Sequence, residues 1–109
     1  MRFAITSVDM AEDFDGALPL TGKILRQLPG PDRSDYFLAA LDAPFTWKKE
    51  KKVISHLVLC ARWVGGVLSP SMSHTPVNIA YVTDESALSD EKLDFRKCYY
   101  AAIGVADGA

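Results

Sequence analysis

Apolar and polar residues alternate along much of this chain with the period of two that is typical of β-strands. Clusters rich in Pro, Gly, Asp and Ser separate the alternating segments, most clearly at residues 29–34 and 69–76. The pattern predicts five strands, and Pro44 interrupts the third of them before it resumes: 2–6, 18–28, 35–42 with 45–47, 53–65 and 77–82.

The segment 53–65 is the longest mainly apolar run of the chain, and Gly65-Gly66 closes it. A run of this length that is rich in Val, Leu and Ile is typical of a central strand covered on both faces. His56, Cys60 and Arg62 occur at even spacing in the run, so a strand places all three on one face. This face is where the sequence concentrates reactive side chains within its core pattern.

Gly22 lies on the apolar face of the predicted strand 18–28, between Leu20 and Ile24. A glycine in such a position often marks a bend, a bulge or a close approach of another backbone. We expect one of these three features at Gly22.

Residues 89–104 are compatible with both a helix and a strand. Ser89 can cap a helix, and Gly104 stands where a glycine often follows one. Aromatic and β-branched residues, Tyr99, Tyr100 and Ile103, favour a strand instead. We expect the helix because apolar positions recur there at helical spacing: Phe95, Cys98, Tyr99 and Ala102.

These elements predict a mainly β protein, or an α+β protein where the C-terminal segment is helical. Short connections favour antiparallel pairing, and a strand that is apolar on both faces must be covered. We therefore expect a small five-stranded antiparallel barrel, or a covered sheet with a C-terminal helix, with residues 1–109 as a single domain. Hydrophobic residues make up 49% and charged residues 24% of the chain, a composition that argues against wholesale disorder.

The charge balance bounds the classes of partner. The chain has 12 Lys and Arg residues against 14 Asp and Glu residues, for a formal net charge of -2 at pH 7. Proteins that bind nucleic acid usually carry a strongly basic face, so this balance argues against nucleic acid as the main partner. The N-terminal segment does not resemble a secretory signal, and no run approaches the roughly 18 apolar residues of a membrane helix. We expect a soluble, cytoplasmic protein with no membrane partner.

The Cys and His residues are the first candidates for metal binding or catalysis. Together they could supply a tetrahedral zinc site: Cys60, Cys98, His56 and His74. Their spacing argues against zinc, because no Cys-x-x-Cys pair occurs and four residues span about 13 Å on a straight strand. No motif places a His beside either thiol, as nucleophilic catalysis requires. The acidic segment 9–16 misses the ligand order of a calcium loop and is expected to be solvated. We therefore expect no metal, no cofactor and no catalytic residue.

Trp47 precedes the lysine-rich segment 48–52. An aromatic side chain beside positive charge can stack single-stranded bases, and small barrels include such proteins. The alternative is a solvated hairpin tip with Trp47 packed at the barrel rim. We treat Trp47 as an exposed candidate for ligand binding, and the loop 72–75 as a second exposed candidate.

Arg62 precedes Trp63 near the end of the predicted strand 53–65. A buried arginine needs a carboxylate partner, so we expect a structural ion pair with one of the nearby acids: Asp42, Asp84 or Asp94. The alternative is that Arg62 binds an anionic ligand at the strand end.

The sequence leaves three hypotheses of function open. The first is a non-enzymatic binding or protein-interaction module that acts through loops and one face of the barrel. The second is a small-molecule-binding protein or enzyme with a site at the barrel mouth around His56, Cys60 and Arg62. The third is a subunit that self-associates, because a second copy could cover strands that are apolar on both faces. The absence of a catalytic motif favours the first.

Overall fold

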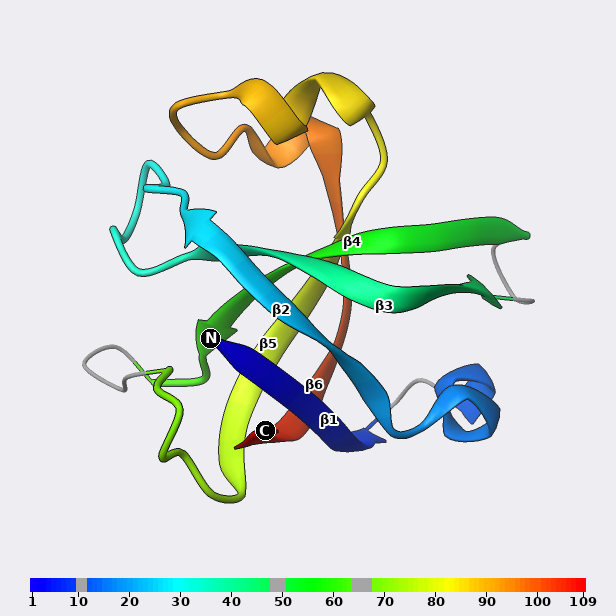
Figure 1. The fold of residues 1–109 in the computed structure, drawn as a ribbon. Coiled ribbons are helices and arrows are strands. Elements are labelled where there is room, and N and C mark those ends of the chain that lie inside the picture. Colours follow the sequence, from blue (N-terminus) through cyan, green and yellow to red (C-terminus); the bar gives the residue numbers. More distant parts are fainter. Residues whose placement is uncertain (10–11, 48–50, 64–67) are drawn as a thin grey trace.

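Six antiparallel strands close into one barrel in the computed structural model, which describes residues 1–9, 12–47, 51–63 and 68–109 (Figure 1). Each strand pairs with its neighbours in sequence, and the last strand closes the barrel against the first. The strands are β1 (Arg2–Asp9), β2 (Leu20–Gln27), β3 (Phe37–Trp47), β4 (Lys52–Ala61), β5 (Thr75–Val82) and β6 (Cys98–Gly108). Short 3-10 helices lie between them: η1 (Glu12–Ala17), η2 (Glu85–Ser89) and η3 (Phe95–Lys97). The predicted mainly β, antiparallel barrel is confirmed.

The C-terminal segment forms the strand β6 rather than the expected helix, so the barrel has six strands and not five. β6 pairs with β5 on one side and with β1 on the other, so its backbone is hydrogen-bonded along both edges. The capping residues of this region serve short turns instead, because Asp84 caps η2 and Asp94 caps η3. Tertiary pairing on both edges therefore overrides the helical spacing of the side chains.

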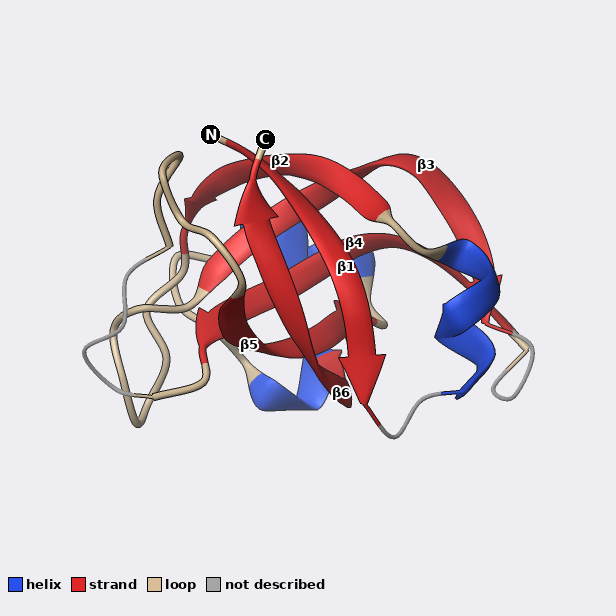
Figure 2. Ribbon diagram, turned by 90° about the horizontal axis from the view of Figure 1, so that it is seen from below, coloured by secondary structure: helices blue, strands red, loops and turns tan. Residues whose placement is uncertain are grey.

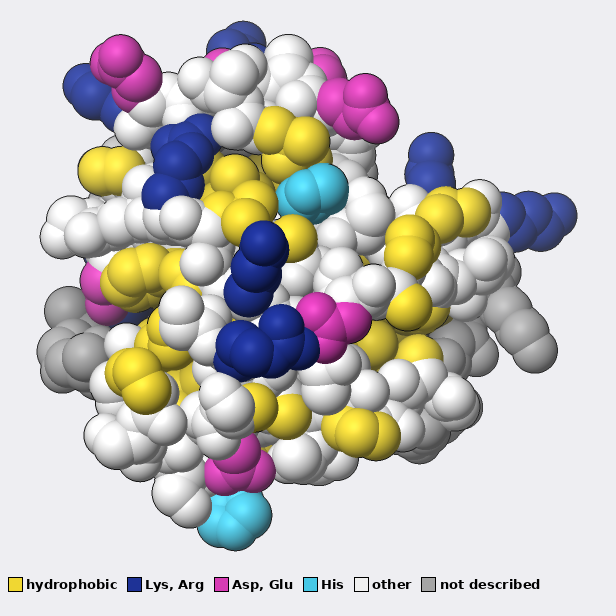
Figure 3. Space-filling model, viewed as in Figure 1, with side chains coloured by type: hydrophobic (Ala, Val, Ile, Leu, Met, Phe, Trp, Pro, Cys, Tyr) yellow, Lys and Arg dark blue, Asp and Glu magenta, His cyan; other side chains and the backbone are white. Residues whose placement is uncertain are grey.

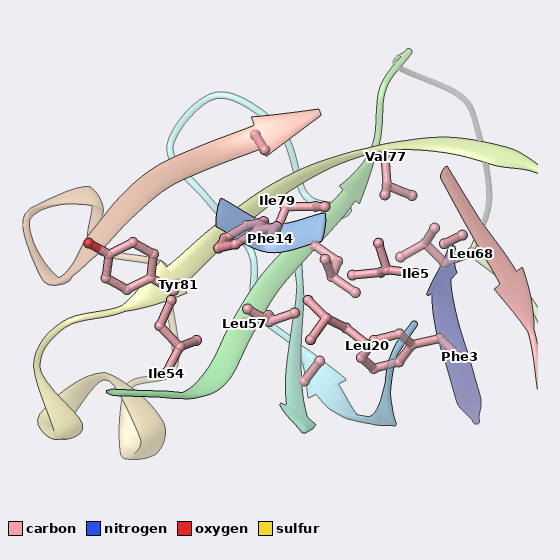
Figure 4. Close-up of a cluster of buried hydrophobic side chains, with 14 of the residues drawn as sticks. Phe3, Ile5, Phe14, Leu20, Ile54, Leu57, Leu68, Val77, Ile79 and Tyr81 are labelled. Atoms are coloured by element: carbon pink, nitrogen blue, oxygen red, sulfur yellow. The ribbon is translucent and has the colours of Figure 1, made fainter. Parts of the chain in front are cut away.

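Alternating side chains of the strands fill the barrel interior, as Figure 4 shows. Phe3 and Ile5 of β1 are 0% exposed, and so are Val77 and Ile79 of β5. The inward faces that alternation predicts for these two strands are confirmed. Burial of large apolar side chains is the main favourable contribution to the stability of a domain of this size.

The helix η1 closes one end of the barrel. Phe14 is 0% exposed, and its ring lies 5.1 Å from the ring of Phe45 and 4.8 Å from that of Trp47, between centroids. The expectation that segment 9–16 is a solvated loop is therefore wrong at Phe14. Phe14 is a large apolar residue among acidic sequence neighbours, and its side chain is buried at the end of the barrel.

The connection from β4 to β5 lies at the opposite end from η1 (Figure 2). Met72 of this connection is 8% exposed and joins the same core, whereas Ser73 and His74 are exposed. The predicted exposure of loop 72–75 is therefore wrong at Met72 and right at the next two residues. The two chain ends lie side by side, and the Ala109 N–H donates to the Arg2 carbonyl at 3.2 Å.

Gly22 lies where three strands come close. It pairs with Phe3 of β1 on one side and with Leu41 of β3 on the other. A Cβ at this position would lie 2.2 Å from the carbonyl oxygen of Ala40. Of the three features expected at Gly22, the structure shows the close approach of another backbone.

Pro44 falls inside β3 and does not end it. The pairing of β3 with β4 shifts register between Ala40 and Phe45, so the irregularity includes Pro44, which has no N–H to donate. The predicted interruption is thus a register shift within one strand. Beyond it, β3 and β4 continue as a paired arm that brings Phe45 and Trp47 against η1.

The loop 83–97 forms an outer layer over the barrel and contains η2 and η3, drawn in yellow and orange in Figure 1. Its ends are held together, because the Thr83 N–H donates to the Lys97 carbonyl at 2.8 Å. Arg26 of β2 ties down its middle, with Nη2 donating to the carbonyls of Leu88 at 2.9 Å and Asp90 at 2.5 Å. A second apolar cluster joins this layer to the barrel: Leu93 of the loop packs with Leu28, Leu38 and Val58.

Candidate functional site

A pocket of about 330 Å³ opens on the outer side of the barrel, between the sheet and the loop 83–97. Its floor consists of side chains from three neighbouring strands: Val58 and Cys60 of β4, Asn78 and Ala80 of β5, and Cys98 and Tyr100 of β6. Figure 3 shows apolar side chains gathered between the loop and the strands on one face of the molecule, with Lys and Arg side chains nearby.

The walls of the pocket come from two connections outside the barrel. Leu93 and Phe95 of loop 83–97 form one wall, and Tyr36, which precedes β3, forms another. Phe95 and Tyr100 are about half exposed, at 48% and 56%, so aromatic rings border the opening. The small side chain of Ala80 leaves space on the floor that a larger residue would fill.

Alternation along β4 turns Cys60 toward this pocket. Leu57 and Leu59 belong to the barrel interior, whereas Val58 belongs to the outer cluster and, with Cys60, lines the pocket. Pairing with β5 places Cys60 opposite Asn78. The predicted strand is confirmed, and it is buried on both faces over residues 57–61. It ends at Ala61 rather than at residue 65, and Val53 near its start is exposed.

Both thiols of the pocket are poor nucleophiles. Burial raises the pKa of the Cys60 thiol, which is 3% exposed. Burial, together with the carboxylates of Asp94 and Asp90, raises the pKa of Cys98 to about 11. A thiol reacts through its thiolate, so the raised pKa lowers the reactivity of both residues at neutral pH.

The two cysteines are free and are too far apart to form a disulfide. Cys60 pairs with Asn78 of β5, whereas Cys98 pairs with Val82, four positions further along the same strand. Four residues of a strand span about 13 Å, and the Cα atoms of a disulfide are at most about 7 Å apart.

Arg62 follows the end of β4, two residues beyond Cys60; it is half-buried and does not line the pocket. Its Nη1 donates to Oδ1 of Asn78 at 3.4 Å, and its guanidinium carbon lies 5.1 Å from the ring centroid of Trp63. The same Asn78 side chain turns its Nδ2 toward Sγ of Cys60, 3.5 Å away. Asn78 therefore links Arg62 to the pocket floor.

The ion pair expected for Arg62 does not form within the described residues, so this expectation is wrong. Its three proposed partners bind other groups: Asp42 pairs with Arg2, the Asp84 carboxylate accepts from the Ser86 N–H, and Asp94 pairs with Arg96. A planar guanidinium is stabilised here by an aromatic ring and one amide oxygen rather than by a carboxylate.

The wall at Tyr36 carries a second set of polar contacts. The Tyr36 hydroxyl donates to the carboxylate of Asp32, with both oxygens 3.0 Å away. Burial and the charge of Asp32 raise the pKa of Tyr36, so the hydroxyl keeps its proton at neutral pH. Arg33 forms a bidentate pair with Asp35, and its guanidinium carbon lies 5.8 Å from the Tyr36 ring centroid.

Of the four predicted ligand-binding residues, only Cys60 lines the pocket; Arg62, His56 and Trp47 do not. His56 is half-buried on β4, and its Nδ1 lies 3.0 Å from Oγ of Ser55. Trp47 is 4% exposed and packs against Phe14 and Tyr81, so its predicted exposure is wrong and the alternative of a rim residue is right. The lysines at 48 and 49 lie outside the described residues.

Asn78, Tyr36 and Leu93 are site residues that the sequence did not indicate. Asn78 occupies the polar position of an alternating strand, where a solvated side chain is the ordinary expectation. The strand order and the loop that folds over β4 and β5 make these residues neighbours. Neither can be derived from a local pattern.

Within the described residues, no group of three or more His, Cys, Asp or Glu side chains is placed to hold a metal ion. The helices of the same residues are all too short or too polar to cross a membrane. Comparisons with known protein families, with curated proteins and with solved structures find no match for this chain.

Proposed function

We propose that this protein is a non-enzymatic binding protein and that its ligand is a small molecule whose apolar part is held in the outer pocket. The observation that carries the proposal is the pocket itself, a concave apolar site between a sheet floor and a tied-down loop. Ligand sites are typically clefts of this kind, lined by apolar and aromatic side chains with a few polar groups.

The size of the pocket limits the ligand. A volume of about 330 Å³ is near the lower end of the range for ligand sites, about 300–1,000 Å³. A single ring system or a short branched chain fits this space. The rings of Phe95 and Tyr100 at the opening suit an aromatic ligand, which would pack edge to face against them.

The chemistry of the lining favours binding over catalysis. The residues that line the pocket include no carboxylate, histidine or lysine. The raised pKa values of Cys60, Cys98 and Tyr36 keep these three groups protonated near pH 7. A general base needs a pKa near the working pH, so none of the three is suited to that role.

The proposal also includes a cytoplasmic location, which two free thiols on a barrel without disulfides support. A protein partner and self-association stay predictions from the sequence. The small molecule is preferred to a protein partner because the site is a pocket rather than a broad flat surface.

Titration with neutral indole, followed by amide shifts in two-dimensional NMR, tests the proposal. Shifts at Asn78, Ala80 and Tyr100 are expected. Ala80→Leu should fill the floor and abolish them, whereas Ala43→Leu makes the same change at an exposed position of β3 and should leave them intact. The melting temperature of each variant reports folding. Indole shifts elsewhere on the barrel, or a folded Ala80→Leu variant that still binds, would contradict the proposal.

A further inference from the structure

Arg62 differs from the other half-buried cations in the described part of the chain. Arg33 pairs with Asp35, and Lys97 donates to Asp90 at 2.7 Å. Arg26 donates to two backbone carbonyls. Among the described residues, Arg62 contacts one amide oxygen at 3.4 Å and the face of a tryptophan ring. A guanidinium has five N–H donors, so most donors of Arg62 have no acceptor within the described residues.

Arg62 is not one of the residues that line the pocket, but it contacts one that does. Asn78 of the pocket floor accepts from Arg62 through Oδ1, and this contact holds the guanidinium beside Asn78. The Nδ2 group of Asn78 faces Sγ of Cys60, and a thiol sulfur is a weak acceptor. One end of the pocket therefore offers amide and guanidinium donors side by side.

The acids around the pocket are paired at both ends. Asp90 pairs with Lys97 and Asp94 with Arg96 near Cys98, and Asp35 pairs with Arg33 near Cys60. Each of these three cations has a carboxylate partner. Arg62 is the exception within the described residues, so its guanidinium is what favours a negative charge at the Asn78 side of the pocket.

Resting on the proposed function, we infer that the ligand is a small aromatic or branched aliphatic carboxylate, and that Arg62 together with Asn78 binds its carboxylate group. The apolar part lies against Ala80, Leu93 and Phe95, and the carboxylate lies at the Asn78 edge. Guanidinium is the side chain best suited to this group because its fork of N–H donors matches the two oxygens of a carboxylate.

A matched pair of probes, indole-3-acetate and indole-3-acetamide, tests this inference, with neutral indole as the reference. The two have nearly the same shape and differ in charge. Hydrogen bonds to a charged group are stronger than neutral ones, so the acetate should bind on the order of tenfold more tightly at low ionic strength. Isothermal titration calorimetry gives each Kd.

Arg62→Gln should remove the preference for the acetate over the acetamide. Lys23→Gln removes one positive charge at an exposed position of β2 and should keep the preference. Arg62→Lys keeps the positive charge and should keep part of the preference for the acetate. Should Arg62→Gln fail to fold, the Kd values of the unsubstituted protein for the acetate and the acetamide, and their salt dependence, decide whether the site prefers a carboxylate.

The outcomes separate the two proposals. Equal binding of acetate and acetamide, or an acetate preference that survives Arg62→Gln, overturns the carboxylate inference and leaves the apolar pocket standing. Failure of all three probes to bind overturns both. An acetate preference that survives Ala80→Leu would place the anion site elsewhere and would also overturn the inference.

Discussion

Gly22→Ala should be among the most damaging single-methyl additions in this protein. The new Cβ would lie 2.2 Å from the Ala40 carbonyl oxygen, whereas ordinary contact begins at 3.4 Å, so a shift of about 1.2 Å is needed. It would also lie 3.0 Å from Cζ of Phe3, a fully buried ring. The oxygen belongs to the backbone of the paired strand β3, so it cannot turn away as a flexible side chain would.

The size of the effect follows from these contacts. Overpacking a core costs about 1–3 kcal/mol, and a ladder hydrogen bond lost beside the clash adds about 1 kcal/mol, so we expect about 3 kcal/mol. Because Gly22 pairs with both Phe3 and Leu41, β2 cannot move without disturbing both neighbours. At roughly 4 °C per kcal/mol for a domain of this length, the melting temperature should fall by about 12 °C.

Urea denaturation followed by circular dichroism measures the loss, and Gly16→Ala is the matched control. A Cβ at Gly16 would meet nothing within 4 Å. The same substitution there should leave stability unchanged or raise it by about 0.4–1 kcal/mol, because alanine restricts the unfolded chain. A Gly22→Ala variant within 1 kcal/mol of the unsubstituted protein would refute the reasoning from close backbone approach.

Three further predictions concern buried groups and the outer loop. Trp47→Phe should change the free energy of unfolding by less than about 1 kcal/mol. Nε1 of Trp47 is buried without a hydrogen-bond partner in the described residues, so removing it relieves a cost of about 1–3 kcal/mol. Trp47→Ala should instead cost about 3–5 kcal/mol, and equal losses of stability for the two variants in urea melts would contradict this. Arg26→Ala removes two hydrogen bonds to loop 83–97, so amide hydrogen exchange should accelerate at Leu88 and Asp90. Lys23→Ala on the same strand should not change this exchange. Unchanged protection after Arg26→Ala would show that Arg26 does not hold the loop in place. Folding raises the pKa of Cys98 from its ordinary 9.0 to about 11, so the folded state holds the proton more tightly and stability should fall as pH rises through this window. Cys98→Ala should flatten that fall in denaturant melts between pH 8 and about 11, and parallel curves for the two proteins would show that the thiol does not contribute.

The barrel could be predicted from the sequence because strand alternation is a local property. Phe3 and Ile5 face inward for the same reason as Val77 and Ile79, since alternate residues of a strand lie on opposite faces. Ambiguity arose at β6, where helical and strand preferences compete within one segment. Pairing with β1 and β5 decides in favour of the strand, and a local sequence pattern carries no information about this pairing.

The candidate site was predictable only in part. Even spacing correctly placed Cys60 on the outer face of β4, whereas Arg62 lies just beyond the end of that strand. The spacing did not indicate which residues lie opposite them. Trp47 was misjudged because its lysine neighbours suggested exposure, although the side chain of a strand residue can point inward beside a solvated turn. Asn78 and Leu93 reach the site through pairing and loop packing, which involve residues far apart in the sequence.

The pairing of β1 with β6 is the one seam of the described barrel that joins distant parts of the chain, with Phe3 opposite Gly108. All other pairings join strands that are consecutive in sequence, so they can form as local hairpins. Opening this seam alone would expose two unpaired strand edges at once, one on each side. Each edge is complementary to the other edge of a second copy. Strand exchange between two open barrels is therefore the misassembly that this topology favours at high concentration.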